Sequence, residues 1–149
     1  MIGVSTCVFC AIVDGSAPST PVLETDNVLA FLDIRPIARG HVLVVPRTHS
    51  SDLESLPPSL GEAVFAAGQR ISRAMRRSDL GSDGANLVVN DGKAAFQTVF
   101  HTHLHVVPRW NGDKLRFARG FVTRRLREPE STAASIREGL DRLAAEESR

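Results

Sequence analysis

The segment that most limits how this chain can fold runs from residue 101 to 107 and reads His-Thr-His-Leu-His-Val-Val. Side chains alternate between the two faces of a β-strand, so the pattern predicts a strand that presents three histidines on one face. Successive rings on that face lie about 7 Å apart, and the intervening residues face a core. Because charged imidazoles repel one another, such a cluster indicates a site that binds a metal or an anion.

The rest of the pattern predicts an α+β domain with an antiparallel sheet of about five strands and one central helix. The helix is expected at 59–77, where apolar residues recur every three or four positions and Ser59 with Glu62 matches a capping box. Short apolar runs bounded by turn residues predict the strands. The other expected elements are a short helix or a turn at 7–13, a hairpin of 22–24 and 28–33, and strands at 41–46, 85–89 and 98–107.

The chain changes character after Pro108. This last part holds ten of the 18 basic residues and seven of the 17 acidic residues. Residues 130–147 carry apolar side chains at helical spacing, which predicts an amphipathic helix. We therefore divide the chain into a domain at 1–116 and a helical C-terminal extension at 117–149. The extension is either a contact for a second copy of the chain or a solvated appendage.

Composition argues against several classes of protein. The 149 residues are 42% hydrophobic and 23% charged, which is typical of a globular protein. A formal net charge of +1 argues against a nucleic-acid partner bound mainly through phosphate charge. Neither a run of about 18 apolar residues nor a secretory leader pattern is present. We therefore expect no membrane partner and a cytoplasmic location.

The chain has five histidines and two cysteines, and all of them lie in three short stretches. Cys7 and Cys10 form a Cys-x-x-Cys pair, which can be a redox pair, half of a metal site or two unreactive thiols. A redox site of the thioredoxin type needs a βαβ context, which the pattern does not predict. Zinc prefers four nitrogen or sulfur ligands, and the two cysteines with His49 provide three.

The motif His-x-His-x-His at 101–105, followed by two apolar residues, resembles the signature of the histidine triad superfamily. The similarity extends from Cys7 to Arg109 and is greatest to the bacterial Hint-like branch, whose members begin with Cys-x-Phe-Cys. It implies the fold of that family and a homodimer whose two sheets join. The other matching motifs are, in chain order, Phe31-Leu32-Asp33-Ile34, Gly40 to Pro46, His49, Asn90 and Gln97-Thr98-Val99.

The resemblance implies a nucleotide hydrolase or nucleotidyl transferase that acts on an α-phosphate. It places the nucleophile on His103, because a neutral imidazole can attack phosphorus and form a phosphoramidate that water then cleaves. His105 would donate to phosphate oxygens, and His41 would support the site from the neighbouring strand. Charge on the phosphoryl group needs positioned donors, and the resemblance assigns that part to Gln97, Thr98 and Asn90.

The resemblance also implies a pocket for a purine nucleoside. Asp33 would accept hydrogen bonds from both ribose hydroxyls, although an aspartate at a strand end is also typical of a turn or a cap. The apolar walls around the purine would be Phe9, Ile12, Phe31, Ile34 and Leu43, which without the family pattern are typical of an ordinary core.

For the metal site, the resemblance implies His101 as the fourth ligand beside Cys7, Cys10 and His49. Zinc bound there would be structural and would tie the N-terminal segment to the sheet, next to the catalytic histidines. No organic cofactor is expected, and a covalent histidine route needs no magnesium.

One position departs from the family pattern. Hint-like relatives commonly have glycine where this chain has Phe96. Glycine permits a positive φ or a close approach of the backbone to a ligand. We therefore expect Phe96 to narrow the leaving-group side of the site or to shift its loop. This would change the preferred leaving group and leave the choice of nucleophile unchanged.

The expected reaction releases a nucleoside 5′-monophosphate, with AMP as the favoured product, from phosphoramidates or adenylated small molecules. One alternative is a hydrolase of dinucleoside polyphosphates. Another is a zinc-stabilised nucleotide-binding module with negligible turnover. A weaker idea makes all the histidines ligands of one catalytic metal, and activity that survives strong chelation would exclude it.

Overall fold

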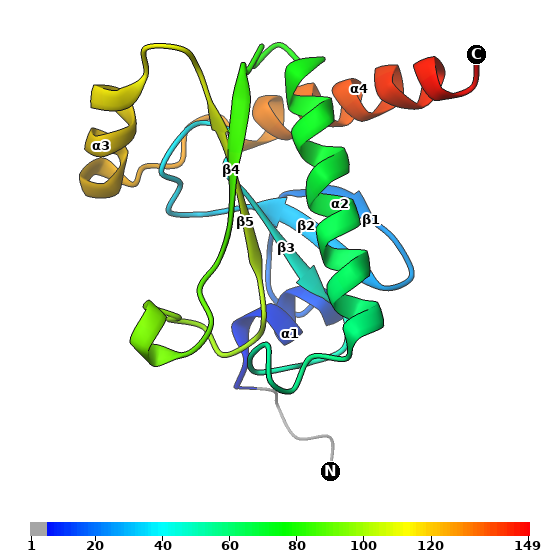
Figure 1. Ribbon diagram of the computed structural model, residues 1–149, viewed down its shortest axis with the longest axis vertical. Coiled ribbons are helices and arrows are strands. Elements are labelled where there is room, and N and C mark those ends of the chain that lie inside the picture. The colour runs from blue at the N-terminus through cyan, green and yellow to red at the C-terminus, as the bar shows by residue number, and fades with distance from the viewer. Residues whose placement is uncertain (1–5) are drawn as a thin grey trace.

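The computed structural model describes residues 6–149, which contain four α-helices and one five-stranded antiparallel sheet (Figure 1). The strand order is β1-β2-β3-β5-β4, so the predicted fold class is confirmed. The strands are β1 (Pro21–Glu24), β2 (Val28–Leu32), β3 (Val42–Pro46), β4 (Gly84–Val89) and β5 (Leu104–Arg109). The helices are α1 (Val8–Asp14), α2 (Pro58–Arg76), α3 (Lys114–Thr123) and α4 (Pro129–Glu147), with a 3-10 turn at Lys93–Ala95.

The two faces of the sheet pack against different helices. On one face, α2 and α4 bury alternate residues of β2, β3 and β5 in the larger core. On the other face, Phe9 of α1 packs against Phe31 and Leu43 in a smaller apolar cluster. Leu43 pairs with His105 across the β3–β5 ladder, and paired residues share a face. The histidine of β5 therefore lies on the α1 side of the sheet.

Helix α2 buries the predicted stripe but begins differently from the prediction. Pro57 is the N-cap residue, no side chain caps the helix, and Ser59 lies inside the first turn, so the capping box is wrong. Pro58 occupies the first helical position, where its fixed φ suits the helix and its missing N–H leaves no donor to satisfy. The buried residues of α2 are Val64, Ala67, Gly68, Ile71, Ala74 and Met75.

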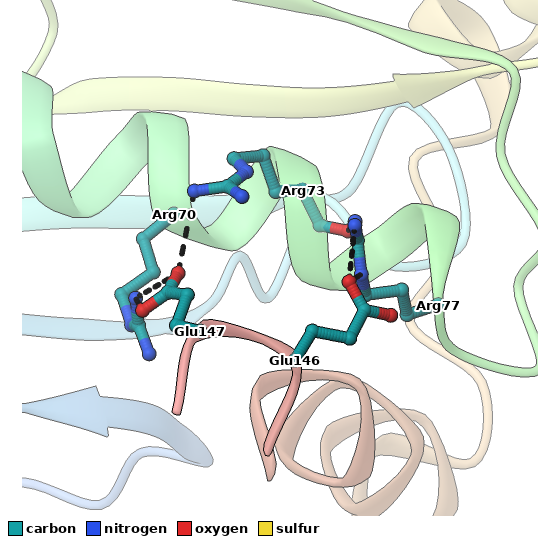
Figure 2. Close-up of polar contacts among 5 residues, drawn as sticks. All are labelled: Arg70, Arg73, Arg77, Glu146 and Glu147. Atoms are coloured by element: carbon teal, nitrogen blue, oxygen red, sulfur yellow. Dashed lines mark hydrogen bonds and ion pairs between the residues drawn. The ribbon is translucent and has the colours of Figure 1, made fainter. Parts of the chain in front are cut away.

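Helix α4 is an integral part of the domain. Ala133, Ile136 and Leu143 are fully buried, and Gly139 lies directly against the carbonyl oxygen of Ala74 in α2. Of the two possibilities for the extension, the solvated appendage is therefore wrong. Figure 2 shows ion pairs that join α2 to the end of α4, namely Arg70 and Arg73 with Glu147, and Arg77 with Glu146.

The last strand is shorter at its start than the predicted strand at 98–107. Its ladders to β3 and β4 both end at Leu104, so His101 and His103 precede the strand and only His105 lies within it. The reason is that Thr102 bonds to a loop instead of a strand, because its N–H donates to the carbonyl oxygen of Ser50 over 2.7 Å. The idea of three histidines on one regular strand is therefore only partly correct.

Helix α3 was not predicted, and it crosses the boundary we placed between residues 116 and 117. It docks through Gly120, which lies directly against the carbonyl oxygen of Ile37 in the segment between β2 and β3. Within residues 6–149, the structure contains no helix with the length and apolar character needed to cross a membrane.

Candidate active site and metal site

His103 lies immediately before β5 and is 5% exposed. Its Nδ1 is 2.8 Å from the carbonyl oxygen of His101, which can only accept a hydrogen bond. Nδ1 must therefore carry the proton, and Nε2 keeps its lone pair. Burial lowers the pKa of His103, against an opposing effect of its bond to the His101 carbonyl and of the nearby Asp33 carboxylate. The ring is thus a neutral imidazole with a nucleophilic Nε2.

A chain of hydrogen bonds fixes the proton positions of His41 and His105. The backbone N–H of Ile37 donates to Nδ1 of His41 over 3.0 Å, so the proton of a neutral His41 is on Nε2. That nitrogen lies 2.9 Å from Nδ1 of His105, which accepts from it. The proton of His105 is therefore on Nε2, a buried atom without a hydrogen-bond partner among residues 6–149. A buried donor in this state suits a ligand oxygen.

Both of these histidines are held neutral by their surroundings. Burial is the largest cause, and it lowers the pKa of His41 to about 4 and that of His105 to about 4. Asp33 opposes the shift in both rings, and its Oδ2 lies 3.5 Å from Nε2 of His41. The nearby Arg124 guanidinium lowers both pKa values further.

Asp33 follows β2 directly and faces the histidines. Its Oδ1 accepts a hydrogen bond from the N–H of Arg35 over 2.8 Å, and its side chain remains 13% exposed. The carboxylate therefore has acceptor capacity left for hydroxyl groups of a ligand.

The apolar residues predicted for a purine pocket gather beside His103, with one exception. The Phe9 ring meets the His103 ring edge-on, with centroids 5.1 Å apart, and meets the Phe31 ring in the same way at 5.6 Å. Leu43 belongs to this cluster, and Ile12 packs against it while partly exposed. Ile34 lies outside the cluster and is 73% exposed.

The three polar residues predicted to contact the phosphate and the leaving group, Asn90, Gln97 and Thr98, lie between β4 and the histidines and differ in their exposure to solvent. Gln97 is buried, and its amide accepts from the N–H of Gly92 and donates to the carbonyl oxygens of Val99 and of Ser51 in the loop after β3, so it joins these two loops. Thr98 is exposed, and Asn90 is half-buried directly after β4. Phe96, the departure from the family pattern, has a left-handed backbone with φ of +66° and is 84% exposed.

Arg124 is a residue that the sequence analysis missed. It ends α3 with a left-handed backbone, φ of +39°, and its buried Nε has no hydrogen-bond partner within residues 6–149. Its charge acts on both His41 and His105. The only signal in the sequence was the basic character of the tail, which does not show where that segment lies in the fold.

Cys7, Cys10, His49 and His101 lie together, with one potential ligand atom from each within 4.8 Å of the others. His101 donates from Nε2 to the carbonyl oxygen of Pro46 over 2.8 Å, so its Nδ1 lone pair faces the cysteines. The two histidine Nδ1 atoms are 3.2 Å apart, and the S···N distances are 3.3 to 3.5 Å. Tetrahedral zinc would require roughly 3.3 Å and roughly 3.6 Å, so this donor set fits zinc.

Comparison with known proteins agrees with this geometry. Residues 14–112 match the HIT domain, and the chain belongs to this family. A crystal structure of a zinc-bound histidine triad family protein from Mycobacterium smegmatis is 52% identical, with a TM-score of 0.87 over 95% of this chain and 97% of that one. The predicted family, and the expected fold with it, are confirmed.

Two relatives extend the comparison. An uncharacterised HIT-like protein of Mycobacterium tuberculosis is 51% identical over 134 residues, which cover 90% of this chain and 92% of that protein. Adenylylsulfatase HINT3 of Arabidopsis thaliana is 41% identical over 116 residues, which cover 74% of this chain and 58% of the plant protein.

Proposed function

We propose that this protein is a nucleotide hydrolase that releases a nucleoside 5′-monophosphate, with AMP favoured, from phosphoramidates or adenylated small molecules. The observation that carries this proposal is the pair of fixed proton positions in adjacent rings. His103 offers a lone pair on Nε2, and His105 offers a proton on Nε2, with ring centroids 5.0 Å apart. A nucleophile and an oxyanion donor side by side suit attack on a phosphoryl group.

The reaction proceeds in two displacements at phosphorus. Nε2 of His103 forms a bond to the α-phosphorus, and the bond from phosphorus to the nitrogen or oxygen of the leaving group breaks. Water then attacks the same phosphorus, the bond to Nε2 breaks, and the nucleotide leaves with the water oxygen. His105 donates to a non-bridging oxygen throughout, and the Arg124 guanidinium adds positive charge on that side. The carbonyl of His101 stabilises the charge that the His103 ring gains.

Substrate recognition uses the groups on either side of these rings. Asp33 accepts from the ribose hydroxyls, and Phe9, Phe31, Leu43 and the flanking Ile12 and Ile34 form the apolar surface for the base. Thr98 and Asn90 face the leaving group and the phosphate, while Gln97 holds their loop. Support for an adenylated substrate comes from the Arabidopsis relative, whose name denotes hydrolysis of adenylyl sulfate.

Substitution of the nucleophile tests the proposal. His103→Ala should abolish turnover and covalent labelling by a nucleotide, while affinity for AMP changes by less than about tenfold. Mass spectrometry of a quenched reaction should find the nucleotide on His103 in the wild type. A module that only binds nucleotides would have no turnover to lose. Product analysis with adenylated compounds and with dinucleoside polyphosphates distinguishes the two hydrolase activities.

The second part of the proposal is that Cys7, Cys10, His49 and His101 hold a structural zinc ion. The bound ion would cross-link the start of α1, the loop after β3 and the segment before β5. Metal analysis should find one zinc per chain, and a strong chelator should lower the melting temperature of the wild type. Cys10→Ser should remove the bound zinc and the chelator effect, whereas His103→Ala should preserve both. Zinc content unaffected by Cys10→Ser would contradict the assignment.

We also propose that the protein is a homodimer. β4 is an edge strand of the sheet, and Val88 on it is 44% exposed, so the edge is open to a second sheet. Sedimentation at micromolar concentration should give twice the chain mass, and Val88→Lys should lower that mass toward one chain.

A further inference from the structure

A cavity of about 920 Å³ lies at the end of the sheet where β2 and β5 finish and β3 begins. Its walls come from the 36–41 segment, the 79–80 turn, and α3 with the 125–127 segment that follows it. Of the residues assigned to the nucleotide and zinc sites, His41 alone lines it. The volume lies within the range of about 300–1,000 Å³ that is usual for small-molecule sites.

The lining of this cavity is strongly basic. Asp79 and Asp113 are its carboxylates, but Asp113 is already paired with Arg109 through hydrogen bonds of 2.9 and 2.7 Å. The cavity therefore has a large excess of positive charge, since five arginines line it and, within residues 6–149, Asp79 is the only other carboxylate in its lining. The arginines are Arg39, Arg116, Arg119, Arg125 and Arg127.

This charge is a local feature and does not reflect the composition of the whole chain. The stretch 109–127 contains seven basic residues and one acidic residue, although the formal net charge of the protein is only +1. The remainder of the chain is therefore net acidic, and four of the seven basic residues of this stretch line the cavity. Concentrated guanidinium groups favour phosphate, because each can form two parallel hydrogen bonds to phosphate oxygens.

The cavity also has apolar walls and partly fixed arginines. Leu80, Trp110 and Phe117 line it. The guanidinium of Arg116 lies over the Trp110 ring, 4.8 Å from its centroid, and Nε of Arg39 donates to the Thr132 hydroxyl over 3.1 Å. Two of the charges are thus held in place before a ligand arrives, which lowers the entropy lost on binding.

We propose that this cavity is a second binding site, for a polyphosphorylated small molecule of the nucleoside polyphosphate class. The arginines bind the phosphates, and the apolar wall around Trp110 receives the base. The cavity shares only His41 with the histidine cluster, and neither His103 nor His105 lines it, so the proposal stands whether or not the protein hydrolyses nucleotides.

Fluorescence offers a direct test, because Trp110 is the only tryptophan in the chain. Titration of the wild type with ATP or with inorganic tripolyphosphate at 150 mM salt should change the Trp110 emission in a saturable manner, and adenosine should not. The same titration of Asp33→Ala should give an affinity within about twofold of the wild type, because Asp33 does not line the cavity. A tenfold or greater loss of binding in Asp33→Ala would place the ligand in the histidine site and overturn the proposal.

Charge reversal provides the matched comparison. Arg119→Glu with Arg125→Glu should weaken tripolyphosphate at least tenfold, whereas Arg76→Glu with Arg149→Glu, the same charge change outside the cavity, should weaken it less than threefold. Equal weakening by the two pairs would mean general electrostatic attraction and would overturn the proposal, as would an unresponsive wild type. Arg119→Gln with Arg125→Gln repeats the test if the glutamates impair folding, which circular dichroism monitors.

Stronger binding of ATP than of tripolyphosphate identifies the nucleotide as the ligand, and the reverse order contradicts a site for the base.

Discussion

Three histidines of one short segment hold their protons on different ring nitrogens because their rings have different hydrogen-bond partners. The carbonyl of Pro46 fixes the proton of His101, the carbonyl of His101 fixes that of His103, and the His41 ring fixes that of His105. The result is one ring whose lone pair faces the two cysteines, one ring with a lone pair on Nε2, and one ring with a proton on Nε2. The sequence predicted which residues gather, but these proton positions depend on carbonyl groups and a loop N–H that a sequence pattern does not reveal.

Phe96 provides a prediction at the residue scale. A left-handed backbone costs a residue with a side chain roughly 1–2 kcal/mol, and the exposed ring recovers little of this by packing. Phe96→Gly should therefore raise the free energy of unfolding by up to about 1 kcal/mol, measured by urea denaturation. Phe96→Ala is the control, because alanine keeps the strain and should leave stability nearly unchanged. A gain of equal size for alanine would show that removal of the ring, rather than φ, is responsible.

The elements differ in how well the sequence predicted them. The hairpin, β3 and α2 came from clear apolar patterns bounded by turn residues and proline, and all are present within a few residues of the prediction. The predicted start of β5 was wrong because residues 98–103 have the residue alternation of a strand but bond to a loop, as Thr102 does to Ser50. Helix α3 was missed because Leu115, Phe121 and Val122 are exposed, so its apolar residues do not mark a buried face.

The contact of α2 with α4 gives a prediction in which one chemical change has opposite effects at two positions. A Cβ at Gly139 would collide with the carbonyl oxygen of Ala74, so Gly139→Ala should lower the free energy of unfolding by about 1–3 kcal/mol. A Cβ at Gly61 in α2 would make an ordinary contact at 3.5 Å with Leu56. Gly61→Ala should therefore raise stability by up to about 1 kcal/mol through helix propensity.

Thermal or urea unfolding of both variants checks this pair. If both substitutions changed the free energy of unfolding in the same direction, the result would contradict the close approach of α4 to α2. Circular dichroism at 222 nm follows the helices directly, and the wild type provides the reference.

At the scale of the whole molecule, the buried histidines make stability depend on pH. His41 and His105 have pKa values of about 4 in the folded protein, against 6.5 as their ordinary value. Between these values the unfolded chain binds protons that the folded protein does not, so the free energy of unfolding falls as the pH falls from 6.5 to 4. Above pH 6.5 neither the folded nor the unfolded chain binds these protons, so this loss of stability is absent.

Urea denaturation at several pH values between 4 and 7 measures this slope. His105→Gln should give a shallower dependence than the wild type, because one of the two titrating rings is gone. All other titratable groups are common to the two proteins and cancel in the comparison. Equal slopes would mean that His105 is protonated in the folded state at these pH values.

The close packing of α4 has a consequence for how the chain can be divided. The stretch that matches the family ends at residue 112, yet Ala133 and Ile136 of α4 belong to the same core cluster as residues of β2 and α2. A truncation at the family limit would leave that hydrophobic surface open to water and prone to aggregation. The folding unit therefore extends beyond the stretch that the family shares, because α4 covers part of the core.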